Sequence, residues 1–258
     1  MKNYFVITAG RTGSAWLADF LSENLKVEAI HEPLEIDDFG TRMPDIRTMR
    51  TFNNFGNNDF IKDFWQRKFK TIPDEGIYAE TNHTLCKCGL VENVIANGRA
   101  DFTTLIVLKR NIVKQCVSYL VRHDFGNITI PWQWYLHPSY SRKIINAQAF
   151  SQFGALGMPL WYCYEMAARQ EYYRQKYADK IEMIEVSLDQ AVHEEGAKSF
   201  LKDLGIAGDC IMPPQKNANK AKPSEEVMKQ VSHIVDQINF DEAKVVREAI
   251  KGGFSFEP

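Results

Sequence analysis

The sequence predicts an α/β protein with a central, mostly parallel sheet covered by helices on both faces. Short apolar or β-branched runs alternate along the chain with longer segments of helical period, the pattern of parallel strands joined by helices. The run 103–108 is apolar without alternation, as expected of a central strand buried on both sides. Since 258 residues are a common length for one α/β unit, we expect a single domain over 1–258.

The expected elements follow in order along the chain. Residues 4–8 form the first expected strand. The apolar residues that follow recur with the spacing of a helix that buries one face, at Trp16, Leu17, Phe20 and Leu21. Further strands are expected over 27–30, 77–80, 103–108 and 181–186, and further helices over 112–121, 161–177, around 200–204 and over 227–238.

Two long segments do not fit this alternation. Residues 36–70 and 122–160 are rich in Asn, Gly, Pro and aromatic residues, and we expect them to be irregular. Connections of this length are uncommon in a compact domain unless they have a function. We therefore expect both segments to be insertions that form a pocket or a lid. The stretch 213–223 is also expected to lack regular structure.

The composition excludes several classes of protein. Lys and Arg number 31 against 33 Asp and Glu, a net charge of -2, which argues against a globally basic nucleic-acid binder. No apolar run approaches the roughly 18 residues of a membrane span, and 4–8 is too short for the apolar region of a signal peptide. Five scattered cysteines are typical of free thiols in a reducing compartment. We expect a cytoplasmic protein with no nucleic-acid or membrane partner, in an oligomeric state that the sequence does not indicate.

The first chemical motif lies between the first expected strand and helix, where residues 10–17 read GRTGSAWL. A strand, a glycine-containing turn and a helix N-terminus bind phosphate through backbone N–H groups and the helix dipole. A tight turn with a capping serine is the purely structural interpretation. The Walker A motif requires Lys after its last glycine, whereas Ser14 follows Gly13 here. An ATPase or GTPase is therefore disfavoured.

The second motif is Arg110, which follows the central strand, with Ser118 eight residues later in the expected helix. Ligands of open α/β sheets bind at the carboxyl ends of the strands. Taken singly, Arg110 is also explained as a surface charge and Ser118 as a helix residue that bonds its own backbone. Both motifs lie where an expected strand ends and the next helix begins, which favours a common ligand site.

Together these motifs resemble the sulfotransferases that use 3′-phosphoadenosine 5′-phosphosulfate (PAPS). Residues 11–17 match their 5′-phosphosulfate loop, a basic residue followed by [Ser/Thr]-Gly-[Ser/Thr]-x-Trp-Leu, and 110–119 resemble their 3′-phosphate segment. Ile112 stands where the family often has Pro, and the Arg form of the loop is closest to the carbohydrate and bacterial branches. The resemblance implies a P-loop NTPase-like three-layer fold. It also implies nucleotide contacts from Arg11, Thr12, Gly13, Ser14, Ala15, Trp16, Arg110 and Ser118, and from Lys216, Asn217, Asn219 and Lys220 in a C-terminal loop.

The same resemblance implies sulfuryl transfer to a hydroxyl or amine, with Arg11 beside the leaving group and a general base. Glu32, at the end of the second expected strand, is the first candidate base; His31 is the second and His83 a further one. A carboxylate suits this role if burial raises its pKa toward neutrality. A solvated strand-end carboxylate is the structural alternative. We expect no metal, because His83, Cys86 and Cys88 lack a second pair of zinc ligands.

The acceptor is less defined than the nucleotide. Five aromatic or imidazole side chains either line an acceptor pocket or pack a long loop: Trp132, Trp134, Tyr135, His137 and Tyr140. We expect the acceptor to be a small alcohol, sugar or amine, and the protein to be an enzyme of specialised metabolism. The alternatives are a nucleotide kinase of the same fold, disfavoured by the missing Walker lysine, and a nucleotide-binding module without turnover.

Overall fold

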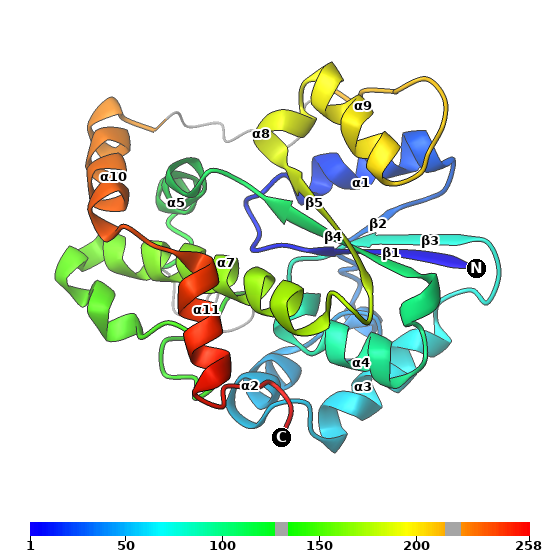
Figure 1. Ribbon diagram of the computed structural model, residues 1–258, viewed down its shortest axis with the longest axis horizontal. Coiled ribbons are helices and arrows are strands. Elements are labelled where there is room, and N and C mark those ends of the chain that lie inside the picture. Colours follow the sequence, from blue (N-terminus) through cyan, green and yellow to red (C-terminus); the bar gives the residue numbers. More distant parts are fainter. Residues whose placement is uncertain (127–133, 215–222) are drawn as a thin grey trace.

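The computed structural model describes residues 1–126, 134–214 and 223–258. Within them, five parallel strands form one sheet in the order β2-β3-β1-β4-β5 (Figure 1). The first strand in the sequence thus lies at the centre, between two strands that come much later. The bounds are β1 Lys2–Ile7, β2 Ile30–His31, β3 Ile77–Thr81, β4 Thr103–Lys109 and β5 Glu182–Ser187.

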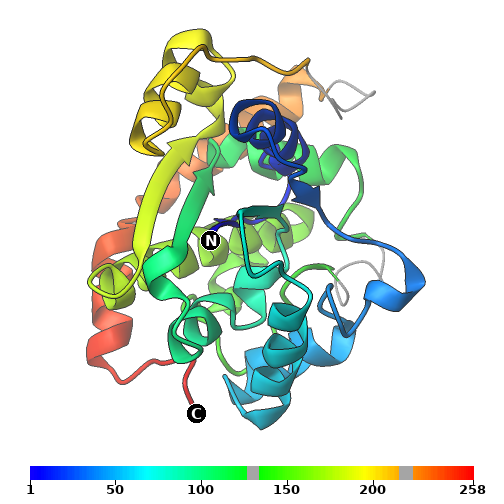
Figure 2. The same cartoon turned by 90° about the vertical axis from the view of Figure 1, so that its right-hand side faces the viewer.

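Helices cover both faces of the sheet, which confirms the predicted α/β fold. Figures 1 and 2 show α1 and α9 above the sheet and α3 and α4 below it. The strands alternate accordingly: Val6 packs with the α1 and α9 side, and Phe5 packs with the opposite side. The helices are α1 Ser14–Leu25, α2 Ile46–Phe55, α3 Asp59–Lys70, α4 Leu90–Ala96, α5 Ile112–Val121, α7 Gly157–Tyr177, α8 Leu188–Ala191, α9 Glu194–Asp203, α10 Glu225–Ile238 and α11 Glu242–Lys251, with 3₁₀ turns η1 Ile36–Asp38, η2 Leu85–Lys87, η3 Ala100–Phe102 and η4 Ala147–Leu156.

The prediction that 36–70 is irregular was wrong, because the segment contains α2 and α3. Each helix has a side-chain cap: Asp45 accepts a hydrogen bond from Thr48 N, and Asn58 accepts one from Ile61 N. The aromatic residues of the segment pack into the core, and Trp65 is fully buried. The described part of 122–160 contains turns and the 3₁₀ helix η4, but residues 157–160 belong to α7, which begins at Gly157 and not at the expected Trp161.

The long helix α7 fixes the carboxyl ends of the two central strands. The Gln170 side-chain amide donates hydrogen bonds to the carbonyl groups of Ile7 (2.9 Å) and Leu108 (3.1 Å). The Tyr162 hydroxyl donates to the carbonyl of Ala9 (2.7 Å). These bonds satisfy buried backbone groups just where the ladder between β1 and β4 ends. They position the loop that follows β1.

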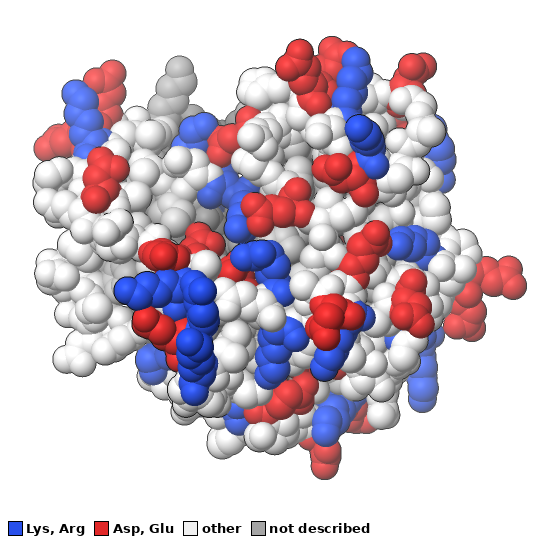
Figure 3. Space-filling model, in the orientation of Figure 1, with Lys and Arg blue, Asp and Glu red and all other residues white. Residues whose placement is uncertain are grey.

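The surface has mixed charge. Figure 3 shows Lys and Arg interspersed with Asp and Glu over the face that it presents. Within the described ranges, no helix is long and apolar enough to cross a membrane.

Candidate functional site

The loop between β1 and α1 has an unusual backbone. Gly10 (φ 85°), Arg11 (φ 54°) and Gly13 (φ 83°) all lie in the left-handed region. Residues in this conformation can turn successive N–H groups to one side and create a concave anion site. The φ of Gly13 favours glycine at this position, and a Cβ atom there would also lie 2.5 Å from Leu188 Cδ1.

Side chains from α5 and α7 hold the carbonyl groups of this loop in the interior. Gln115 Nε2 donates to the carbonyl of Gly10 (2.9 Å), and the Tyr119 hydroxyl contacts the carbonyls of Ala9 (2.9 Å) and Gly10 (2.8 Å). The negative ends of these peptide dipoles therefore point into the protein. Gly13 is the N-cap of α1, and no side chain of the described residues caps this helix, so its positive end can accept an anion.

The remaining predicted loop residues differ in their surroundings. Thr12 and Ser14 are buried, and Ala15 is half-buried. The Thr12 hydroxyl is hydrogen-bonded to the Thr8 hydroxyl. The Trp16 ring is buried and stacks on Phe20 with centroids 5.2 Å apart, so it belongs to the core. The first-turn N–H of Trp16 is the part that faces the helix N-terminus.

The two sequence motifs meet in space. Arg11 Nε donates to Ser118 Oγ (3.2 Å), and Arg110 donates from a guanidinium N–H to the carbonyl of Arg11 (2.7 Å). Arg110 Nε is buried and has no hydrogen-bond partner among the described residues. Burial lowers the pKa of Arg110, partly offset by Asp189. Two guanidinium groups and a hydroxyl thus converge beside the loop, as the parallel sheet predicts.

Asn111 explains the missing proline of the second motif. Asn111 is the N-cap of α5, and its side chain accepts a hydrogen bond from Lys114 N (3.1 Å). Ile112 is the first helical residue, a position where Pro is favoured but not needed. The helix that supplies Ser118 is therefore well defined without it.

Glu32 lies beyond the end of β2 with a left-handed backbone (φ 48°) and a side chain that is 17% exposed. Its Oε1 is 3.5 Å from His83 Nε2, and its Oε2 is 3.9 Å from His31 Nε2. Burial raises the pKa of Glu32, partly offset by His31, Lys87 and Arg11. His31 is held at the end of β3, since its Nδ1 lies 2.9 Å from the Thr81 carbonyl. The three candidate bases therefore gather at one place.

His83 is buried against the loop. Its ring lies 3.2 Å from the position that a Cβ atom on Gly10 would take. Burial lowers the pKa of His83 well below its usual value, and the nearby charges of Lys87, His31 and Arg11 lower it further. His83 is therefore a neutral imidazole at neutral pH.

Sequence reasoning missed Lys87, at the end of η2. Its side chain is fully buried, and its Nζ lies 2.9 Å from His83 Nδ1 and 2.8 Å from the Tyr162 hydroxyl. Burial lowers the pKa of Lys87 to about 7, partly offset by Cys86, Cys88 and Glu32. A lysine four residues after a candidate base, between two cysteines, is the signal that could have found it.

The predicted aromatic cluster divides into two parts. Trp134 and Tyr135 lie near His83, with ring centroids 6.1 and 5.7 Å from the imidazole. His137 and Tyr140 pack on one another instead (6.0 Å). Trp132 lies outside the described residues, as do the four predicted nucleotide contacts of the C-terminal loop, Lys216, Asn217, Asn219 and Lys220.

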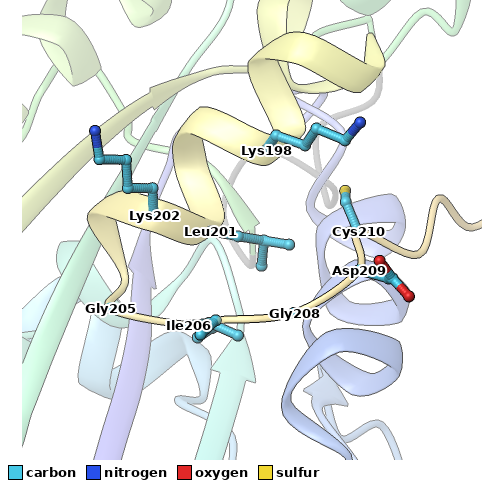
Figure 4. A pocket seen from close by; sticks show the side chains of 9 residues that line it. Lys198, Leu201, Lys202, Gly205, Ile206, Gly208, Asp209 and Cys210 are labelled. Atoms are coloured by element: carbon cyan, nitrogen blue, oxygen red, sulfur yellow. The ribbon is translucent and has the colours of Figure 1, made fainter.

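A separate hollow of about 500 Å³ lies between α9 and the loop that follows it (Figure 4). Lys198, Leu201, Lys202, Ile206 and Cys210 contribute to its lining. Among the predicted site residues that the structure describes, none lines it. Over the ranges that the structure describes, no three His, Cys, Asp or Glu side chains are grouped so that they could hold a metal ion.

Comparison with known proteins gives a likeness of fold. No protein-family model matches the chain, and no curated protein matches its sequence. The crystal structure of a sulfotransferase from Alicyclobacillus acidocaldarius matches with a TM-score of 0.52 over 97% of this chain and 96% of that one, at 11% sequence identity. This likeness shows that the two chains share the P-loop-like three-layer α/β fold.

Proposed function

We propose that this protein transfers a sulfuryl group from PAPS to a hydroxyl or amine of a small alcohol, sugar or amine. One observation supports the proposal above all: Arg110 and Ser118 are both hydrogen-bonded to Arg11, which lies in the loop after β1. A loop with a free helix N-terminus suits one phosphate group. Arg110 and Ser118, beside it, suit a second.

The residues of the site fit such a nucleotide. Arg110 Nε is a buried donor without a partner among the described residues, and no described side chain caps the N-terminus of α1 at Gly13. Arg110 and Ser118 would hold the 3′-phosphate. Arg11 and the N–H groups of Gly13 and Ser14 would hold the 5′-phosphosulfate, which supplies the sulfuryl group and the leaving phosphate.

Glu32 is the proposed general base. It accepts the proton of the acceptor O–H or N–H while the acceptor atom bonds to sulfur and the bond from sulfur to the 5′-phosphate oxygen breaks. Arg11 and the loop N–H groups stabilise the negative charge that remains on the phosphate. The products are the sulfated acceptor and 3′,5′-ADP. Trp134 and Tyr135, which lie near His83, are proposed to line the acceptor side.

The chain is proposed to act as one domain in the cytoplasm. All five cysteines are free, which is typical of a reducing compartment.

Thermal-shift measurements test the nucleotide. We expect 3′,5′-ADP to raise the melting temperature more than 5′-AMP, which lacks the 3′-phosphate, because ligands that bind only the folded state stabilise it. Arg110→Ala should abolish the difference between the two nucleotides, and Arg47→Ala, a change at an exposed surface arginine, should preserve it. Stabilisation by ATP or GTP but not by 3′,5′-ADP would overturn the proposal.

Transfer of labelled sulfate from PAPS, screened over alcohols, sugars and amines, tests the reaction. Arg11→Ala should remove most of the transfer, because the guanidinium stabilises the charge of the leaving group, a contribution of about 10²–10³ in rate. The fold of this variant should stay intact. Unchanged far-ultraviolet circular dichroism would show the intact fold. Full activity of Arg11→Ala would contradict the role of Arg11.

A further inference from the structure

Lys87 is a buried lysine whose side chain has one acceptor for each of its three donors. Its Nζ contacts His83 Nδ1 (2.9 Å), the Tyr162 hydroxyl (2.8 Å) and the carbonyl oxygen of Trp134. An ammonium group has three N–H donors and no acceptor. The Tyr162 proton is engaged with the carbonyl of Ala9, so the Tyr162 oxygen accepts from Lys87. All three bonds are therefore satisfied when Lys87 donates each of them.

This arrangement determines where His83 carries its proton. Because Lys87 donates to Nδ1, that nitrogen must offer its lone pair, and a neutral imidazole then carries its proton on Nε2. The Nε2 atom lies 3.5 Å from Glu32 Oε1. A proton on Nε2 is therefore the ring proton closer to the carboxylate that we propose as the base.

We propose that Lys87 is a positioning residue, which fixes His83 as the Nε2–H tautomer so that His83 orients Glu32 as a hydrogen-bond donor. The inference rests on the proposed sulfuryl transfer, and it ranks Glu32 above His83 among the candidate bases. His83 has no free lone pair for the acceptor proton, because Nδ1 faces Lys87 and Nε2 is protonated. Glu32 remains as the proton acceptor, and His83 acts on the reaction only through it.

The charges around His83 support one tautomer. Lys87 approaches from η2, Arg11 from the loop after β1, and Glu32 and His31 from the end of β2. A proton on Nδ1 would face an ammonium group at 2.9 Å. A proton on Nε2 faces a carboxylate instead. The uncharged rings of Trp134 and Tyr135 complete the surroundings.

Nitrogen-15 NMR of the histidine rings tests the inference directly in the wild-type protein. At about pH 6, below the pKa of Lys87, we expect His83 Nδ1 to resonate as an unprotonated nitrogen and Nε2 as a protonated one. His83→Gln assigns the signals. Protonation of Nδ1 in the wild-type protein would overturn the inference, whether or not any variant folds.

Two variants of Lys87 add kinetic evidence. Lys87→Met removes the donor and should yield a mixture of tautomers, with kcat lower by about 10- to 100-fold, a part of what general-base catalysis contributes. The KM for the acceptor and the binding of 3′,5′-ADP should change little. Lys87→Gln keeps a donor and should keep both the tautomer and most of kcat. Loss of kcat in Lys87→Met with an unchanged His83 tautomer would contradict the positioning role.

Lys68 offers a control, because it is a second fully buried lysine whose bonding partners are Glu80 (2.7 Å) and the carbonyl of Arg42 rather than His83. Lys68→Met should destabilise the fold and leave the His83 tautomer unchanged. If wild-type His83 shows the expected tautomer and no acceptor is ever sulfated, the proposed function fails alone. If transfer is found and the tautomer is wrong, only the inference about Lys87 fails.

Discussion

At the scale of single residues, Glu32 is the group on which the proposed chemistry depends. It is mostly buried, and its burial raises the pKa of the carboxyl group. A base must be unprotonated to work, so activity should fall as the pH drops through this raised pKa. The neighbouring groups His31, Lys87 and Arg11 limit this rise of the pKa.

Glu32→Gln is the sharpest test of this residue. The amide is nearly isosteric and cannot accept the proton, so kcat should fall by about 10²–10⁴ while 3′,5′-ADP binding is retained. Glu28→Gln is the matched control, since Glu28 is an exposed glutamate just before β2 and should leave kcat unchanged. The pH profile of the wild-type enzyme should show an acid limb above the ordinary range of a glutamate. Equal loss in both variants would argue against Glu32 as the base.

The sequence could predict that the residues we propose for the nucleotide lie together, but it could not predict the position of Lys87. Arg11, Arg110 and Ser118 stand at carboxyl ends of parallel strands or in the helix that follows, and such ends meet at one sheet edge. Lys87 reaches His83 and Tyr162, which belong to different parts of the chain. No local pattern places those three side chains together, because the packing of α7 brings Tyr162 there.

At the scale of elements, the turn between β1 and α1 depends on Gly13. Its φ of 83° is strained for any other residue, and a Cβ would also press on Leu188. The backbone of this turn carries the N–H groups that we propose for the phosphosulfate. Its shape is therefore part of the site.

Gly13→Ala should lower the melting temperature and abolish stabilisation by 3′,5′-ADP. The left-handed conformation costs about 1–2 kcal/mol for alanine, and crowding of Leu188 adds to it. Gly76→Ala separates the two effects, because Gly76 has a similar φ of 81° and nothing within 4 Å of its added Cβ. Gly76→Ala should cost stability alone and leave the ligand response intact. A normal response to 3′,5′-ADP in Gly13→Ala would show that the turn does not bind it.

Helices and strands were predicted correctly where the sequence carries a strong local signal. The helix expected over 112–121 coincides with α5, where Asn111 caps a strongly apolar segment. The prediction for 36–70 was wrong because its asparagines and aromatic residues resemble the composition of a loop, although Asp45 and Asn58 are helix caps. The strand expected over 27–30 is the shorter Ile30–His31, because only these two residues pair with β3.

At the scale of the whole molecule, the interior contains ionisable groups that couple stability to pH. Glu92 on α4 is fully buried beside the Tyr173 side chain. Burial raises the pKa of Glu92 to about 8. The folded protein therefore keeps this proton between the usual value of 4.5 and about 8, where the unfolded chain releases it. Stability should fall as the pH rises through this window.

Glu92→Gln should remove this loss. The free energy of unfolding of the wild-type protein should decrease by up to about 1.4 kcal/mol per pH unit from this one group, and the variant should lack that slope. Denaturant unfolding at several pH values between 5 and 8 measures it. Glu195→Gln, at an exposed glutamate of α9, should leave the slope unchanged. Identical slopes in the wild type and Glu92→Gln would show that Glu92 ionises without cost.

The central position of β1 also has a kinetic consequence. Lys2 pairs with Ile77, and Asn3 pairs with Thr103, so the middle of the sheet closes only after long stretches of chain have been brought back to it. Loop-closure entropy opposes such pairings, and folding slows as contacts become less local. The loop after β1 receives its supporting bonds from Gln115 and Tyr119, which arrive with these distant segments. A refolding chain should therefore recover affinity for 3′,5′-ADP, the ligand that we propose, late, after most of its helices have formed.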